Sequence, residues 1–510
     1  MAIDTITTSR SYMTKQVTSL SKMMVEKTTQ LASEKSSTTF GGLGNNRLLD
    51  LELTQRVGQI DAYKETIIQA NLHMETLNLT LERLEDLRID AKAAINSNDF
   101  VLQSDGQTRS QETAKVLLHE AVNLLNTEVA GYYLYGGKDA FTDPVAAVED
   151  ILEGAGGKDG LKQVMNEFYQ ANLGANNNGR LDVSALTTNL TLGVPTDSTF
   201  TIAEDGAHDF GFDISSVTSG LSNVAITGPT GTDPDSFDVQ FTGQPVLGDE
   251  ISFEFTLPPG HTETFKLDLK ATSEGGEGAF AIGADLAETA ENLRVKISEE
   301  LEKEAQTSLK AISDEWAADN FFDTFGGAEP MRVDGPPFDT STTLISGAAT
   351  TVAWYVGENS PTTDARNDKS AIVDNNLEVN YGARANENGL KDIVKSLATF
   401  ISADFSAATD NDKLYYSSSA ASMRAILQPE GADQSGIVDI TTDVAIAYRA
   451  VKNSDDRHDQ MRSSYLTTVD EIEGVDKELL AAEILQLQTN IEASYRASSI
   501  VYNLSIVDYL

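Results

Sequence analysis

The 510-residue sequence contains no cysteine, which excludes disulfides, thiolate metal sites and cysteine nucleophiles. No apolar run approaches the length of a membrane span, and residues 1–31 lack the apolar block of a cleaved secretory signal. Basic residues are scarce, with 37 Lys and Arg against 79 Asp and Glu, and they form no basic patch that would favour nucleic acid. These absences fit a protein that works outside the cell or passes through a narrow export channel.

Residues that perform chemistry are also scarce. The sequence has no His-Glu-x-x-His motif, nucleophile elbow, dinucleotide fingerprint or carboxylate pair in a recognisable frame. The five histidines are His73, His119, His208, His261 and His458, and no two of them have the spacing of metal ligands. We therefore expect no enzyme, no catalytic residue, no cofactor and no metal. His458 lies on an apolar helical stripe, which predicts a packing residue.

Two carboxylate clusters could hold calcium, but their spacing does not match the twelve-residue calcium loop. We interpret both as acidic, solvated turns of a very acidic region. The clusters are Glu204, Asp205 and Asp209, and Asp233, Asp235 and Asp238.

The net charge of −42 is unevenly distributed. Residues 1–140 carry a net charge of −4 and residues 385–510 a net charge of −10, so residues 141–384 carry −28. Surfaces that associate with each other should be near charge balance, whereas a solvated outer surface can be acidic. Solubility alone and a more specific role both remain open for the acidic middle.

Both ends of the chain have the apolar spacing of long helices that pack on other helices. Helices are predicted over residues 4–35 and 48–95, separated by a small-residue loop at 36–46 that lacks the pattern of a phosphate-binding loop. Arg10 and Lys27 interrupt the apolar stripe of the first helix. The stripe consists of Ile6, Met13, Val17, Leu20, Met24 and Leu31.

Helices resume near residue 387 and continue, with a break at Gly474, to the end of the chain. Because free terminal helices usually fray, amphipathicity sustained to the last residues predicts a partner surface. We expect the last helix to contribute to an assembly interface with the first. Its contacting residues would be Leu480, Ile484, Leu487, Ile491, Val501, Leu504 and Leu510.

The middle of the chain is predicted to contain a β-sandwich-like module at 186–272, because alternating segments occur at 199–202, 237–241, 251–255 and 264–269. A helix is expected over 286–316 and a strand at 352–356. The fold class is therefore mainly α with an inserted β-rich region, in which both chain ends form an elongated helical bundle around a variable β/α domain. The expected domains are 1–47 with 475–510, 48–140 with 385–474, 141–185 with 273–384, and 186–272.

Three segments of the sequence resemble motifs of one known family. Tyr133-Leu134-Tyr135-Gly136-Gly137 resembles a motif near the end of the third helix of the flagellin superfamily of bacterial flagella, and the segment from Tyr381 to Glu387 resembles that family's re-entry into the helical region. The ending from Leu504 to Leu510 is similar to the Leu-Phe-Asp-Tyr-Leu ending of the hook-associated members at the hook–filament junction. Ser33-Glu34-Lys35-Ser36 departs from the family's Ser-Gly-x-Arg pattern, which leaves the contacts of this loop open.

The resemblance implies a structural, extracellular subunit of the flagellum, exported without a cleaved signal peptide. The terminal helices would be poorly ordered in the free subunit and would assemble with other copies, a neighbouring hook-associated protein and flagellin. Whether an export chaperone binds the C-terminal helix is left open. The alternatives are flagellin itself, or a secreted adhesin or binding module in residues 186–384.

Overall fold

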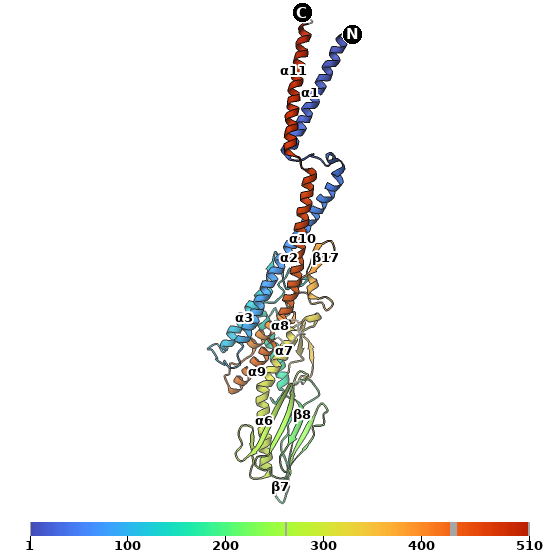
Figure 1. Ribbon diagram of the computed structural model, residues 1–510. Helices are drawn as coiled ribbons and strands as arrows, with labels where there is room; N and C mark the ends of the chain where they lie inside the picture. Colours follow the sequence, from blue (N-terminus) through green and yellow to red (C-terminus); the bar gives the residue numbers. More distant parts are fainter. Residues whose placement is uncertain (1, 261–262, 429–435, 508–510) are drawn as a thin grey trace. The chain divides into compact units, whose positions relative to one another are not determined.

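The protein is described by a computed structural model over residues 2–260, 263–428 and 436–507 (Figure 1). The chain is mainly helical, with a β-rich region inserted between its helical ends, as the sequence predicted. It divides into two compact units, which are described separately below. One consists of Met1–Asn71, Ala371–Val379 and Arg449–Leu510, and the other of Leu72–Ser370 and Asn380–Tyr448.

The helices at the two chain ends form where apolar residues recur at threes and fours. At the N-terminal end they are α1 (Ala2–Ser33), α2 (Arg47–Ala94) and α3 (Arg109–Leu125). At the C-terminal end they are α8 (Asn388–Ser402), α9 (Asp410–Ile426), α10 (Ile437–Glu473) and α11 (Lys477–Val507). A 3-10 turn, Phe40–Asn46, joins α1 to α2, and the predicted break at Gly474 separates α10 from α11.

In the first unit, α1 and α11 pack against each other and run antiparallel, so that the start of α1 lies near the end of α11 (Figure 1). Ion pairs join α2 to α10, including Lys64 with Asp455 and Arg462 with Asp61. A two-stranded ribbon, β16 (Ser370–Asp374) and β17 (Leu377–Asn380), contacts α10 through His458. This unit is therefore built largely from paired helices.

In the second unit, α8 is the most deeply buried of the long helices described. Its residues Leu390, Ile393, Val394 and Leu397 have no exposed surface, and the helix contacts α3, α7 (Ser308–Phe322) and α9. Shorter elements surround it: α4 (Val148–Glu153), the ribbon β3 (Gly154–Ala155) with β4 (Lys158–Asp159), α5 (Leu161–Leu173), β1 (Glu128–Val129) with β2 (Tyr132–Tyr133), and β14 (Met331–Val333) with β15 (Leu344–Ser346).

The same unit contains a β-module whose two sheets share one core. One sheet has the order β5-β7-β10-β9, with β6 also paired to β7, and the other has the order β13-β12-β11-β8. Aromatic side chains from both sheets meet inside, as where the ring centroids of Phe237 and Phe253 lie 5.6 Å apart. The strands are β5 (Leu181–Val183), β6 (Thr187–Thr191), β7 (Val194–Glu204), β8 (Asp213–Ser219), β9 (Val224–Thr227), β10 (Ser236–Phe241), β11 (Glu250–Leu257), β12 (Glu263–Thr272) and β13 (Ala279–Ala281).

Strand alternation explains this module, because the residues of β11 alternate between buried and partly exposed positions. All four alternating segments predicted from the sequence lie in its strands. Helix α6 (Leu286–Gln306) adds Leu293, Ile297 and Leu301 to the same core. These residues form the apolar face by which α6 packs on the sheets.

Two predictions of secondary structure were wrong. The helix predicted over 286–316 is broken at Thr307, whose φ of −120° and ψ of −87° end α6 and begin α7. Residues 352–356 form no strand, because only single bridges such as that between Val145 and Tyr355 pair them. Their apolar pattern instead reflects burial of Trp354, whose indole N–H donates to the Phe322 carbonyl at 3.0 Å.

Candidate assembly interface

The apolar stripe of α1 faces α11. Along the described part of the helix, the positions that lose exposure recur at spacings of four and three, which is the spacing of a helix–helix seam. The seam positions are Met13, Val17, Leu20, Met24, Lys27 and Leu31, and the adjacent Ser21 and Gln30 also lose exposure. The side chain of Ile6 lies outside the described residues.

The stripe of α11 has the same spacing. Leu480 is buried, and the following seam positions are half-buried, continuing into small polar residues where Ser498 lies 3.8 Å from the Met13 sulfur. The half-buried apolar residues are Ile484, Leu487 and Ile491. The side chains of Val501 and Leu504, and the whole of Leu510, lie outside the described residues. The structure therefore places the described predicted residues in a seam within one chain.

Lys27 interrupts the apolar seam without leaving a buried charge unpaired. Its amino group lies 2.7 Å from the carboxylate of Glu483 on α11, and the two side chains keep 34% and 41% of their surface exposed. An ion pair this exposed contributes little to stability. The seam is consequently weaker here than an apolar contact would make it.

Both helices also carry large apolar side chains outside the seam. On α1 these are Tyr12, Met23 and Val25, and on α11 they are Leu479, Leu485, Tyr495 and Ile500, all exposed to solvent. A groove of about 520 Å³ between the helices adds a recess lined mainly by small and polar residues, including Ser19, Ala493 and Ala497. A two-helix pair with this much exposed apolar surface has too few apolar partners within itself, and such a surface is typical of an interaction site.

Sequence reasoning missed these outward residues because a search for one stripe per helix discards apolar residues that lie off it. The sequence nevertheless contained a sign of them. A solvated helix face usually carries charged and polar residues, so apolar residues on that face stand out. Apolar residues on several faces of one helix indicate burial on more than one side.

The loop between α1 and α2 is tied to the end of α10. The backbone N–H of Ser36 donates to the Glu473 carbonyl, and Lys35 forms an ion pair with the Glu473 carboxylate. Glu34 has a φ of +58°, in the left-handed region that favours glycine. A glutamate therefore adopts this turn at some conformational cost.

Asp50, near the start of α2, is fully buried, and neither of its carboxylate oxygens has a hydrogen-bond partner in the part of the chain that the structure describes. Burial and the nearby Glu473 carboxylate raise the pKa of Asp50, although Lys35 opposes the shift. Three ionisable groups, those of Lys35, Asp50 and Glu473, therefore lie close together where the loop meets the ends of α2 and α10.

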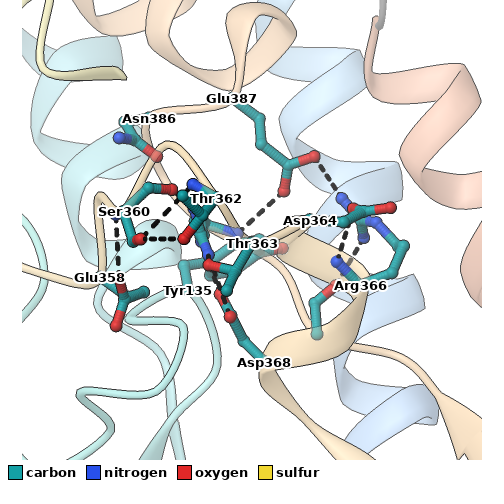
Figure 2. A network of polar contacts seen from close by, with 12 residues as sticks. Tyr135, Glu358, Ser360, Thr362, Thr363, Asp364, Arg366, Asp368, Asn386 and Glu387 are labelled. Carbon is teal, nitrogen blue, oxygen red and sulfur yellow. Dashed lines mark hydrogen bonds and ion pairs between the residues drawn. The ribbon is translucent and has the colours of Figure 1, made fainter. Parts of the chain in front are cut away.

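Two of the segments that carry the superfamily resemblance meet in the second unit (Figure 2). Gly136 pairs with Arg384 in an isolated bridge, and the N–H of Ala385 donates to the Tyr135 carbonyl at 3.0 Å. Gly137 has a φ of +64°, and a Cβ there would lie 2.7 Å from both Asp368 and Glu358. The motif around Tyr135 and the segment around Arg384 are thus one local structure, although about 250 residues separate them.

Arg384 is the centre of this polar network. Its guanidinium makes a two-pronged contact with Asp368, at 2.5 and 3.0 Å, and a further hydrogen bond to the Thr363 hydroxyl at 2.6 Å. The side chains of Arg384 and Asp368 are 1% and 0% exposed. Because a buried charge is tolerated only when it is paired, each of these two residues requires the other.

A second ion pair, between Arg366 and Glu387, lies beside the first (Figure 2). Burial raises the pKa of Glu387, and Arg366 opposes that shift. Burial also lowers the pKa of Lys369, whose amino group donates to the Tyr133 carbonyl at 2.6 Å, to about 8. The network holds these backbone segments in place. Its arginine and carboxylate groups form ion pairs with each other.

The carboxylate clusters predicted as solvated turns agree with that expectation at Asp205, Asp209 and Asp233, which are exposed, but not at Asp235. Asp235 is buried and accepts hydrogen bonds from the backbone N–H groups of Thr230, Gly231 and Ser236, so it holds a turn together from inside. Asp205 pairs with Arg180 and His208. The interpretation as solvated turns was therefore wrong for Asp235, because backbone donors replace its water.

His458 is a packing residue, as predicted. It is buried, stacks on Tyr63 with ring centroids 5.5 Å apart, and its Nε2 lies 2.7 Å from the Val373 carbonyl. His261 lies outside the described residues. Within residues 2–260, 263–428 and 436–507, no three His, Asp or Glu side chains come together in a way that could hold a metal ion.

Comparison with known proteins identifies no relative. No model of a known protein family matches the chain, and a search of curated proteins finds no similar sequence. In the described ranges, no helix has both the length and the apolarity that crossing a membrane requires.

Proposed function

We propose that this protein is a non-enzymatic structural subunit of the bacterial flagellum, an adaptor at the junction between hook and filament. The observation that carries the proposal is the pair of terminal helices, whose seam is half-buried while large apolar residues such as Tyr12, Leu485 and Tyr495 stay exposed. In the proposed subunit, both chain ends form an elongated helical bundle and the acidic insert faces solvent.

Assembly would complete the packing that one chain begins. Helices from neighbouring copies, from an adjoining hook-associated protein and from flagellin would cover the outward apolar residues of α1 and α11. Such burial contributes roughly 25 cal/mol per Å² of apolar surface removed from water, in addition to what the seam supplies. Ordering of the terminal helices is thereby coupled to assembly.

The choice within the superfamily rests on sequence. The ending Asp508-Tyr509-Leu510 resembles that of hook-associated members, whereas flagellins tend to end differently. The Tyr135 motif and the Arg384 segment contact each other in the fold. This contact supports the superfamily resemblance, because a single local structure would account for both motifs. The alternative is flagellin itself, the filament subunit. The experiment must distinguish it from the junction adaptor.

Deleting the gene tests the proposal. We expect cells that keep their hooks, lose their filaments and release flagellin into the medium. Cells that keep normal filaments would contradict the proposal. Loss of filaments with no flagellin in the medium would identify the chain as flagellin instead.

Complementation then tests the exposed surface. Leu485→Asp places a charge on an exposed apolar position of α11 and should fail to restore filaments, whereas Gln486→Asp, at the neighbouring exposed polar position, should restore them. Equal restoration by both variants would show that the outward apolar residues are not part of an interface.

A further inference from the structure

One end of the β-module carries exposed apolar side chains that the proposed function does not use. Leu192 is fully exposed, at 101%, and four further side chains are between 59% and 66% exposed. We call these five residues the apolar tip: Leu190, Leu192, Val194, Val246 and Leu247.

Strand register places the five residues at the same end of the module. Leu190, Leu192 and Val194 lie around the turn that joins β6 to β7, and β7 leaves this turn toward Ser198. Phe241, the last residue of β10, pairs with Ser198, so the loop that follows β10 and carries Val246 and Leu247 begins at that end. Figure 1 shows β7 reaching this end of the module.

The turn itself is chemically unusual. Leu192 and Gly193 have φ values of +54° and +83°, as in the tight hairpin turns that strongly favour Asn-Gly. A leucine in this left-handed conformation is unfavourable, and its side chain makes no compensating burial within the chain. A residue that costs stability and is fully exposed is explained by a contact outside the chain.

The tip is also free of charge in a strongly acidic region. No charged residue occurs in 183–196 or in 239–248, although residues 141–384 carry a net charge of −28. Asp197 and Asp249, which border these segments, are hydrogen-bonded to Asn189 and to the backbone of Ser222 and Val246. The tip is therefore a neutral, apolar patch within a strongly acidic part of the chain.

This charge distribution indicates which kind of molecule binds the tip. Nucleic acid carries charge along its whole length, so a contact at the tip would bring its phosphates against the acidic residues of the module. The tip has neither the aromatic nor the basic residues that anchor a protein in a lipid interface. A second copy of the chain presents the same neutral patch, and contact between two tips keeps the like-charged surfaces apart.

We propose that the apolar tip binds the apolar tip of a second copy of this chain. Five side chains form a small contact, so it would be transient between free chains and would become populated where copies are held side by side. In that respect the inference extends the proposed function by linking the inserts of neighbouring subunits, but the contact itself can be tested on purified chain.

The absence of cysteine makes cross-linking specific. We would introduce Leu192→Cys into the full chain, with Val356→Cys as the matched control, because Val356 is an apolar residue 49% exposed on the insert outside the tip. Each variant is oxidised mildly at high protein concentration, and the yield of disulfide-linked dimer is corrected for the labelling rate of that cysteine. We expect several-fold more dimer from Leu192→Cys than from the control.

Salt and a second substitution sharpen the test. Screening of the acidic surfaces should raise the Leu192→Cys yield between about 50 and 500 mM salt, since the Debye length shrinks over this range. Adding Val194→Asp should reduce the yield to that of the control.

A yield equal to the control, or one that falls with salt, would overturn the proposal. So would binding of the unsubstituted chain to phosphatidylcholine vesicles that Leu192→Asp abolishes, if Leu192→Cys forms no more dimer than the control. None of these outcomes bears on the gene-deletion phenotype, so this inference and the proposed function can fail separately.

Discussion

The pair of terminal helices and the Arg384 network solve the problem of burial in different ways. In the network, the side chains of Arg384 and Asp368 are almost completely buried, and each is the charged partner of the other. In the helix pair, the seam residues are half-buried, an ion pair replaces one apolar contact, and large apolar residues remain exposed. One region is complete within a single chain, and the other has apolar surface left to bury.

This difference relates stability to assembly. A completed core holds its shape before any partner arrives, whereas a half-buried helix pair gains most of its stability from what covers it. A subunit built in this way can fold one rigid part before it assembles and can order the other part on contact. The following predictions test that contrast, beginning with the largest effect.

Hydrogen exchange on dilute chain should separate the two regions most strongly. Backbone amides of α8, which is buried, should exchange more slowly than those of α1 and α11 by a factor of about 1,000 or more, because opening energies range from near zero to the global free energy. The terminal amides should gain protection when the chain assembles. Equal protection of α8 and α11 at low concentration would contradict the contrast.

Breaking the buried ion pair should strongly destabilise the second unit. Arg384→Met leaves Asp368 buried without its partner, which should cost about 3–5 kcal/mol of unfolding free energy. The double variant Arg384→Met with Asp368→Leu removes both charges and should recover much of that loss. Urea unfolding followed by tryptophan fluorescence suits this test, because Trp316 and Trp354 both lie in the second unit. A double variant no more stable than the single one would argue against an electrostatic role.

Local periodicity explains what the sequence could predict. The spacing of Met13, Val17 and Leu20 predicted the seam, and the alternation in 251–255 predicted β11, because both patterns report which face of an element is buried. The same reasoning placed His458 in a packed interior.

Contacts between distant residues explain what the sequence could not predict. Arg384 and Asp368 are sixteen residues apart, and neither stands out from the many charged residues of this chain. Asp235 carries the same side chain as its solvated neighbours, and only the folded turn supplies the three N–H donors that bury it. Trp354 lies in an apolar run that resembles a strand, but its neighbours come from α7 and from residues 144–146.

A buried carboxyl group should make the stability of the second unit depend on pH. Burial raises the pKa of Asp314 from 3.8 to about 7, although the Tyr415 hydroxyl donates a hydrogen bond to it. Because the folded state favours the protonated form, the contribution of this group is most favourable below about pH 4 and is lost as the pH rises to about 7. The loss should be on the order of 4 kcal/mol.

Asp314→Asn removes this dependence and identifies its source. The variant should match the parent chain in stability near pH 4 and exceed it increasingly up to about pH 7, as measured by urea unfolding with tryptophan fluorescence. Asp323→Asn, an exposed position just after α7, is the control and should change stability little at any pH. Parallel pH profiles for the parent and Asp314→Asn would refute the assignment.

The smallest expected effect concerns the interruption of the terminal seam. Lys27→Leu replaces a half-exposed ion pair with an apolar contact and leaves Glu483 partly in water, so the α1–α11 pair should gain about 1 kcal/mol. The gain should appear as slower hydrogen exchange in α1 of the dilute chain. Lys22→Leu, on the exposed face of the same helix, is the matched control and should leave this exchange unchanged. Faster exchange after Lys27→Leu would show that the ion pair holds the helices together, and the terminal pair would then resemble the Arg384 network more closely than its exposure indicates.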